Sequence, residues 1–325
     1  MTGKIIKGIA GFYYVLCEDE CLYECKAKGG FRKDGVKPLV GDNVVVRVLD
    51  EAKCLGNIEE ILERKNQLIR PAVANVDQAM VVFAAADPVP NLNLLDRFLV
   101  MMEWQNVETV ICLSKEDIVS QDEMKELSSV YEKCANKVLT ISNLKETGLE
   151  EVRFELEGRT TVLAGPSGVG KSSLLNHLCP EAESQTGAIS EKIGRGKHTT
   201  RHSELFCLGE GTYLFDTPGF SSLRLPTIQK EELCQYFTEF APYEGMCRFQ
   251  PCSHIHEPGC VVKEQLEKGE LCQSRYDNYR QMYEEIADQE RRKNWRKSGS
   301  CLCAAWYFHC QKQRKYLRLH RMSEM

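Results

Sequence analysis

The stretch that decides the fold is Gly165-Pro166-Ser167-Gly168-Val169-Gly170-Lys171-Ser172, which fits the phosphate-loop pattern G-x4-G-K-[ST] in full. An apolar run at 160–164 predicts a buried strand before it, and 172–178 predicts a helix after it. In that setting the glycines let backbone N–H groups surround a phosphate at the start of the helix. We therefore expect this loop and Ser173 to bind a nucleotide, with Lys171 at the β- and γ-phosphates and the Ser172 hydroxyl on Mg²⁺.

Further along the chain, Asp216-Thr217-Pro218-Gly219 follows a predicted strand at 212–215. Phosphate-loop NTPases place a second Mg²⁺ contact on an acidic residue at the end of a strand, so we assign Asp216 to the metal and the Gly219 N–H to the γ-phosphate. Taken alone, these four residues would favour an ordinary β-turn.

The segment between these motifs, residues 194–202, is polar, basic and interrupted by glycine. Its adjacent Thr199 and Thr200 suit a switch loop that γ-phosphate and metal order and that hydrolysis releases. The sequence does not decide which threonine would complete the Mg²⁺ coordination, and a plain basic loop is the alternative. The candidate catalytic residues are thus Lys171, Ser172, Asp216 and these two threonines.

On the N-terminal side, Ser114-Lys115-Glu116-Asp117 follows a predicted strand at 108–113. The Asp117 carboxylate can accept hydrogen bonds from N1 and N2 of guanine, which adenine does not offer, and the stem of Lys115 can pack on the base. Alone, the pattern is a weak signal and favours a helix N-cap Ser with solvated charges. Beside the phosphate motifs it predicts a guanine-nucleotide pocket built from all four residues.

The order of the motifs is unusual, because the base-reading motif precedes the phosphate loop and in ordinary GTPases it comes last. The motifs can still converge on one nucleotide if the chain enters the sheet at a different point. The alternation of strands and helices after residue 72 predicts the parallel α/β sheet that this requires.

The flanking regions have different patterns. Residues 4–70 carry short strands with Gly turns, which favours a small barrel such as the five-stranded OB-fold, and 26–33 looks like a basic hairpin suited to RNA.

Downstream, Cys247, Cys252, His254 and Cys260 have the spacing of a closed Cys3His zinc site, with His256 as a less favoured ligand. We divide the chain into four regions: 1–70, 71–228, 229–292 and a basic tail at 293–325.

Composition excludes several classes of protein. The 325 residues include 42 Lys and Arg against 47 Asp and Glu, and no apolar run is long enough to span a bilayer. The N-terminus lacks the apolar core of a signal peptide, so we expect a cytosolic protein in which the 16 cysteines stay reduced. Residues 291–325 hold ten Lys and Arg and one Glu, so the acidic total does not argue against a nucleic-acid partner.

Together these motifs resemble the circularly permuted ribosome-assembly GTPases, specifically the RsgA family, over about residues 1–290. The resemblance implies a multidomain chain: an OB-fold β-barrel, a circularly permuted P-loop GTPase α/β domain and a helical zinc-binding domain. It also implies a monomeric GTP hydrolase that binds the small (30S) ribosomal subunit and its rRNA and assists late maturation. The subunit would stimulate hydrolysis, which drives release; the expected cofactors are one structural Zn²⁺ and Mg²⁺ with GTP, and no membrane is involved.

The sequence departs from the family pattern at two positions, and two alternative functions remain open. Ser114 stands where the family usually has Asn or Thr, and Phe220 stands where many GTPases have a water-orienting Gln, which predicts slow intrinsic hydrolysis. The alternatives are an ATPase or metabolite kinase, and an RNA-binding zinc protein whose nucleotide site is vestigial. The tail at 293–325 suits a basic arm on rRNA, a second metal site or an accident of the reading frame.

Overall fold

The computed structural model describes residues 1–29, 31, 36–69, 71–180, 204–209, 211–217 and 222–294. The chain divides into two compact units, Met1–Pro226 and Thr227–Met325. In the described ranges, no helix has the length and apolar character needed to cross a membrane.

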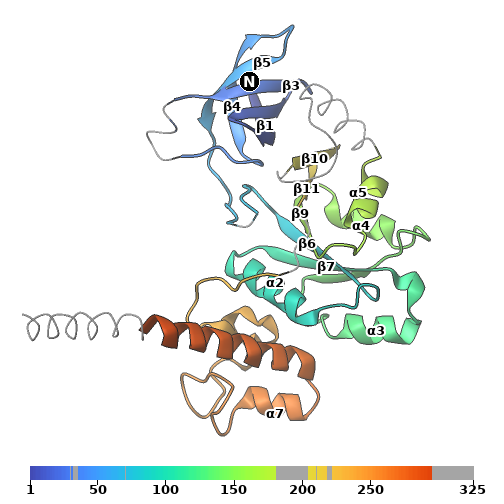
Figure 1. The fold of residues 1–325 in the computed structure, drawn as a ribbon, viewed down its shortest axis with the longest axis vertical. Coiled ribbons are helices and arrows are strands. Elements are labelled where there is room, and N and C mark those ends of the chain that lie inside the picture. The colour runs from blue at the N-terminus through green and yellow to red at the C-terminus, as the bar shows by residue number, and fades with distance from the viewer. Residues whose placement is uncertain are drawn as a thin grey trace, which may run out of the picture. The chain divides into compact units, whose positions relative to one another are not determined.

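The first unit begins with a closed five-stranded barrel (Figure 1). Its strands are β1 (Thr2–Ile9), β2 (Phe12–Cys17), β3 (Leu22–Ala27), β4 (Asn43–Asp50) and β5 (Leu55–Ile61), joined in the order β1-β2-β3-β5-β4. Alternate side chains point inward and fill the barrel, among them Ile5, Val15, Val44 and Ile58. The predicted OB-type barrel is confirmed.

The expected basic hairpin at 26–33 is wrong. Strand β3 pairs with β2 on one side and runs parallel to β5 on the other, so β3 and β4 are not neighbours. Lys26 pairs with Phe12 on one side and Asn57 on the other, which leaves it no free edge for a hairpin partner. Residues 30 and 32–35 lie outside the described residues.

The rest of the first unit is a six-stranded sheet in the order β10-β11-β9-β6-β7-β8. Strands β6 (Gln78–Ala84), β7 (Glu108–Ser114), β8 (Lys137–Thr140), β9 (Thr160–Ala164) and β11 (Thr212–Asp216) are parallel, and β10 (Glu204–Gly209) is an antiparallel edge. Helices α2 (Leu92–Trp104) and α3 (Gln121–Ser129) contribute to one hydrophobic cluster, and α4 (Leu149–Leu156) and α5 (Lys171–Leu178) to a second, so the sheet is covered on both faces (Figure 1).

Local signals set the helix boundaries here. Asn91 caps α2 by accepting a hydrogen bond from the Leu94 N–H, and Ser120 forms a capping box with Glu123 at the start of α3. In the parallel part of the sheet all carboxyl ends lie along one edge, which is where α/β proteins bind ligands. The loops after β6, β7, β8, β9 and β11 therefore meet there.

The second unit is mainly helical. It contains the 3-10 helices η2 (Leu233–Tyr236) and η3 (Thr238–Tyr243), helix α7 (Val261–Glu267) and a long helix over 273–294. Its core is aromatic: the Phe237, Phe240 and Tyr279 rings pack with centroids 5.1 to 5.5 Å apart. A buried ion pair joins Arg275 to Glu239 at 2.8 Å and ties the long helix to η3.

Candidate nucleotide site and metal centre

The phosphate loop connects β9 to α5, as the sequence predicts. At Gly165 the loop passes so close to β6 that an added Cβ would lie 2.2 Å from the Val82 carbonyl oxygen. Gly168 and Gly170 have φ angles of +82° and +92°, a conformation that residues with a side chain seldom adopt. The pattern of glycines is thus required by the backbone path around the loop.

Lys171 folds back over this loop. Its ammonium donates hydrogen bonds to the carbonyl oxygens of Gly165, at 2.8 Å, and Pro166. Burial lowers the pKa of Lys171, and the Asp216 carboxylate partly opposes that shift. A cation that is shielded from water at this loop attracts the negative charge of a polyphosphate.

Asp216 lies at the end of β11, beside the strand that leads into the phosphate loop. It pairs with Leu163 in the parallel register, and the hydroxyl of the next residue, Thr217, donates to the Leu163 carbonyl at 2.7 Å. Burial raises the pKa of Asp216, Lys171 opposes the shift and Glu204 adds to it. The predicted Thr199, Thr200 and Gly219 lie outside the described residues.

Ser114 contacts the phosphate loop itself. Its buried hydroxyl donates to the Val169 carbonyl at 2.6 Å, and the Phe83 carbonyl lies 3.3 Å away. This hydroxyl therefore supports the loop that carries the phosphate amides, which accounts physically for a small polar residue at the end of β7.

The next three residues each have a defined partner. Lys115, with φ of +62°, donates to the Asp87 carbonyl, while Thr147 donates to Glu116. Asp117, in the 3-10 helix η1 (Glu116–Ile118), accepts a hydrogen bond from the Ser142 hydroxyl. That hydrogen bond lowers the pKa of Asp117, so the ionised carboxylate keeps acceptor sites for a base.

Sequence reasoning missed Ser142, Asn143 and His177. Asn143 follows β8 and its side-chain N–H donates to the Gly170 carbonyl at 3.1 Å, while His177 of α5 lies 3.1 Å from the Asn143 carbonyl. Asn143 Oδ1 is buried without a hydrogen-bond partner among the described residues, which leaves an acceptor beside the phosphate loop. The available signal was the position of Ser-Asn at the carboxyl end of a predicted strand, at the same sheet edge as the other motifs.

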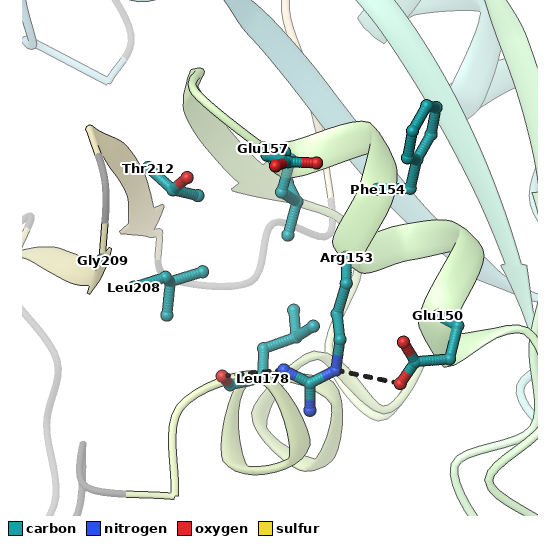
Figure 2. Close-up of a pocket in the computed structure, with 9 residues that line it drawn as sticks. Glu150, Arg153, Phe154, Glu157, Leu178, Leu208, Gly209 and Thr212 are labelled. Atoms are coloured by element: carbon teal, nitrogen blue, oxygen red, sulfur yellow. Dashed lines mark hydrogen bonds and ion pairs between the residues drawn. The ribbon is translucent and has the colours of Figure 1, made fainter.

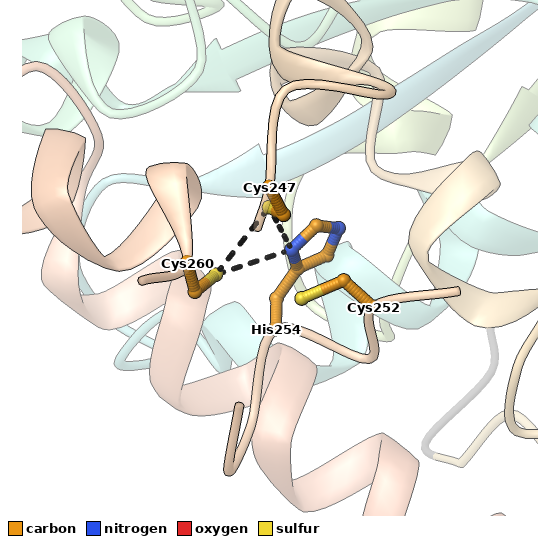
Figure 3. A group of neighbouring side chains, drawn as sticks. All are labelled: Cys247, Cys252, His254 and Cys260. Carbon is orange, nitrogen blue, oxygen red and sulfur yellow. Dashed lines mark hydrogen bonds between the residues drawn. The ribbon is translucent and has the colours of Figure 1, made fainter. Parts of the chain in front are cut away.

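The four predicted zinc ligands converge in the second unit (Figure 3). His254 Nδ1 lies 3.6 Å from Cys247 Sγ and 3.3 Å from Cys260 Sγ, and the two sulfurs are 3.9 Å apart. All four ligand atoms, with that of Cys252, lie within 4.8 Å of one another. A tetrahedral zinc ion with bonds of about 2.0–2.3 Å needs ligand separations of about 3.5–3.8 Å, so the cluster fits zinc.

The protonation chemistry of the cluster agrees with a cation site. Burial raises the pKa of Cys252 to about 12 and also raises that of Cys260, so a bound cation is needed to hold these groups as thiolates. Burial lowers the pKa of His254, which favours the neutral imidazole that binds metal. His256 is exposed and does not belong to the cluster.

Residues behind the ligands fix the loop that carries them. The Tyr276 hydroxyl donates to the His254 carbonyl at 2.7 Å, and that of Tyr279 donates to the Ser253 carbonyl. Burial alone would raise the pKa of Glu257, but hydrogen bonds from Ser253 and neighbouring backbone N–H groups lower it to about 2. These hydrogen bonds hold the loop between Cys252 and Cys260 in place.

A cavity of about 580 Å³ lies elsewhere, between α4, the end of α5 and the β10–β11 hairpin (Figure 2). In it, Arg153 donates to the carbonyls of His177 and Leu178 and pairs with Glu150 at 3.5 Å. Arg153 therefore satisfies the last carbonyls of α5, a structural role. None of the nucleotide motifs lines this cavity.

The fold and the site define a P-loop GTPase with a circularly permuted sheet, preceded by a barrel. Residues 61–226 match the family model described as RsgA GTPase, and residues 2–55 match the RsgA N-terminal domain. The chain belongs to the RsgA GTPase family.

Relatives and solved structures match this chain over most of its length. It is 55% identical to the small ribosomal subunit biogenesis GTPase RsgA of Agathobacter rectalis, over 90% of this chain and 100% of the relative. The RsgA of Alkaliphilus metalliredigens is 51% identical, over 89% and 99% of the two chains. YjeQ from Thermotoga maritima has a TM-score of 0.75 at 36% identity, over 88% and 98%. YloQ, described as a circularly permuted GTPase, has a TM-score of 0.72 at 40% identity, over 89% and 95%.

Proposed function

We propose that this protein binds GTP, hydrolyses it to GDP and phosphate on the small ribosomal subunit, and acts in the biogenesis of that subunit. The observation that carries the proposal is the convergence of three separate motifs on one loop. Ser114 and Asn143 bond to the carbonyls of Val169 and Gly170, and Thr217 bonds to the strand that enters the loop. Residues that come before the phosphate loop in the sequence and residues that come after it thereby form one nucleotide site.

Within this site we assign the phosphates to the backbone N–H groups of 165–170, with Lys171 and Ser173. The base is assigned to the loop that contains Asp117, whose ionised carboxylate selects guanine. This protein's contribution to catalysis is positioning and charge neutralisation, without a covalent intermediate.

Magnesium fits the oxygen donors at the sheet edge, since Mg²⁺ prefers hydroxyl and carboxylate ligands. Ser172, Asp216 and one of Thr199 and Thr200 would hold it, and bound Mg²⁺ would neutralise charge that develops on the phosphate oxygens. We assign a structural zinc ion to the Cys3His cluster, where it stabilises a small irregular unit.

The barrel is the proposed contact to rRNA. On it, the Lys26 ammonium lies 5.2 Å from the centroid of the Phe12 ring, and a cation beside an aromatic ring suits both phosphate and base. We propose that the protein acts in the cytoplasm as a monomer with domain limits near residues 70, 228 and 292. Late maturation of the subunit is its proposed stage, with hydrolysis driving release.

Nucleotide-dependent binding to ribosomal subunits tests this proposal. Full-length protein is sedimented with purified small subunits in the presence of a non-hydrolysable GTP analogue, GDP or a non-hydrolysable ATP analogue, and large subunits serve as the control. We expect co-sedimentation with small subunits and the GTP analogue, and release with GDP. Equal binding in all nucleotides, or binding unchanged in Lys171→Ala, would favour an RNA-binding zinc protein instead; a preference for the ATP analogue would favour an ATPase.

A further inference from the structure

The barrel contacts the two sheet strands that lead to the magnesium side of the nucleotide site. The Lys7 ammonium of β1 lies 2.7 Å from a carboxylate oxygen of Glu204, the first residue of β10, and the two side chains are only 11% and 18% exposed. Lys4 lies 5.0 Å from the centroid of the Tyr213 ring on β11. Gly41 lies against Phe215, where an added Cβ would come within 3.0 Å of the ring.

Glu204 is also the cross-strand partner of Asp216. The antiparallel register of β10 and β11 places the two residues directly opposite each other, so their side chains lie on the same face of the sheet. The proximity is electrostatically effective, because Glu204 is one of the charges that act on the Asp216 carboxylate. A lysine from the barrel thus neutralises the carboxylate that stands beside the proposed magnesium ligand.

We propose that Lys7 and Glu204 are positioning residues that set the charge around Asp216, so that the barrel takes part in binding Mg²⁺ and GTP. This inference rests on the proposed function, in which Asp216 contacts the metal and the barrel contacts RNA. A shielded ion pair holds its two partners more firmly than an exposed one, and removal of one partner leaves an uncompensated charge. A change in how the barrel is held on RNA would then reach the nucleotide site through this pair.

The direction in which Mg²⁺ binding changes distinguishes this role from a merely structural one. In Lys7→Gln, Glu204 keeps its negative charge without a counter-ion, so the site should attract Mg²⁺ more strongly. In Glu204→Gln the negative charge is lost, so the site should attract Mg²⁺ less. Damage to packing would instead weaken binding in both variants.

The experiment measures binding of a fluorescent, non-hydrolysable GTP analogue to the full-length protein as Mg²⁺ is titrated. We expect the half-saturating Mg²⁺ concentration to fall about threefold to tenfold in Lys7→Gln and to rise by a similar factor in Glu204→Gln. The double neutral variant Lys7→Gln with Glu204→Gln removes both charges together and should return toward the parent value. Neutral substitutions of Lys137 and Glu155, a 2.9 Å ion pair at the start of β8, serve as the matched control and should leave the value unchanged.

Shifts of the half-saturating Mg²⁺ concentration in the same direction in both single variants, or no shift in either, would overturn the proposal.

A second measurement, GTP turnover with small subunits, tests transmission, meaning whether the barrel affects the nucleotide site through this ion pair. The two single variants and the double neutral variant all lack the ion pair and should lose at least half of the stimulation, whereas full stimulation in every variant would refute transmission. If the parent protein is not stimulated at all, the proposed function fails, and the Mg²⁺ titration still decides the role of the pair.

Discussion

Replacing Asp117 by Asn should change which base the protein binds. The Ser142 hydroxyl donates to this carboxylate and lowers its pKa, so the ionised group can accept from both N1 and N2 of guanine. Hydrogen bonds to a charged group contribute about 1.5–3 kcal/mol each, so losing both would weaken GTP binding by about 3–6 kcal/mol, or roughly 10² to 10⁴-fold. The amide N–H of Asn would instead donate to the 2-oxo group of xanthine.

The assay is a titration of fluorescent GTP and XTP analogues against the wild-type and variant proteins. Asp117→Asn should bind the XTP analogue more tightly than the GTP analogue, the reverse of the wild type. Asp122→Asn, an exposed carboxylate on α3, is the matched control and should keep the wild-type preference. The reasoning would be refuted if Asp117→Asn bound the GTP analogue within about threefold of the wild type.

Three further changes have outcomes that the geometry fixes. Gly165→Ala places a Cβ 2.2 Å from the Val82 carbonyl oxygen, so the phosphate loop must shift and GTP analogue binding should weaken at least roughly tenfold in a fluorescence titration; unchanged affinity would contradict the loop geometry. Cys260→Ser removes one of four ligands, so the zinc content measured by atomic absorption should fall well below one ion per chain and the second unit should unfold at lower temperature; full zinc content would exclude this cluster as the site. Glu239→Gln leaves Arg275 buried without its counter-ion, so urea unfolding should show a loss of about 3 kcal/mol, and an unchanged midpoint would show that the pair contributes little.

Motifs with local signals could be predicted from the sequence. The strand expected at 160–164 forms as β9, and the helix expected at 172–178 is α5, Lys171–Leu178. The phosphate loop and the zinc ligands are short patterns in which spacing alone fixes the chemistry. Their residues could therefore be predicted as two candidate sites before any tertiary contact was known.

Long-range pairings had no such local signal. Lys7 and Glu204 are 197 positions apart, and nothing in either neighbourhood predicts their contact. The hairpin prediction at 26–33 failed for the same reason, because β3 pairs with β2 and β5 and not with β4, the next strand along the chain. Asn143 was missed because its function depends on the Gly170 carbonyl, which only the folded sheet brings within reach.

GTP turnover by the purified protein, with and without small ribosomal subunits, tests the central claim most directly. Large subunits and ATP are the controls, and Lys171→Ala defines the background. We expect slow hydrolysis by the protein alone and stimulation of roughly tenfold or more by small subunits with GTP only. Turnover that is insensitive to small subunits, or that is equally fast with ATP, would contradict it.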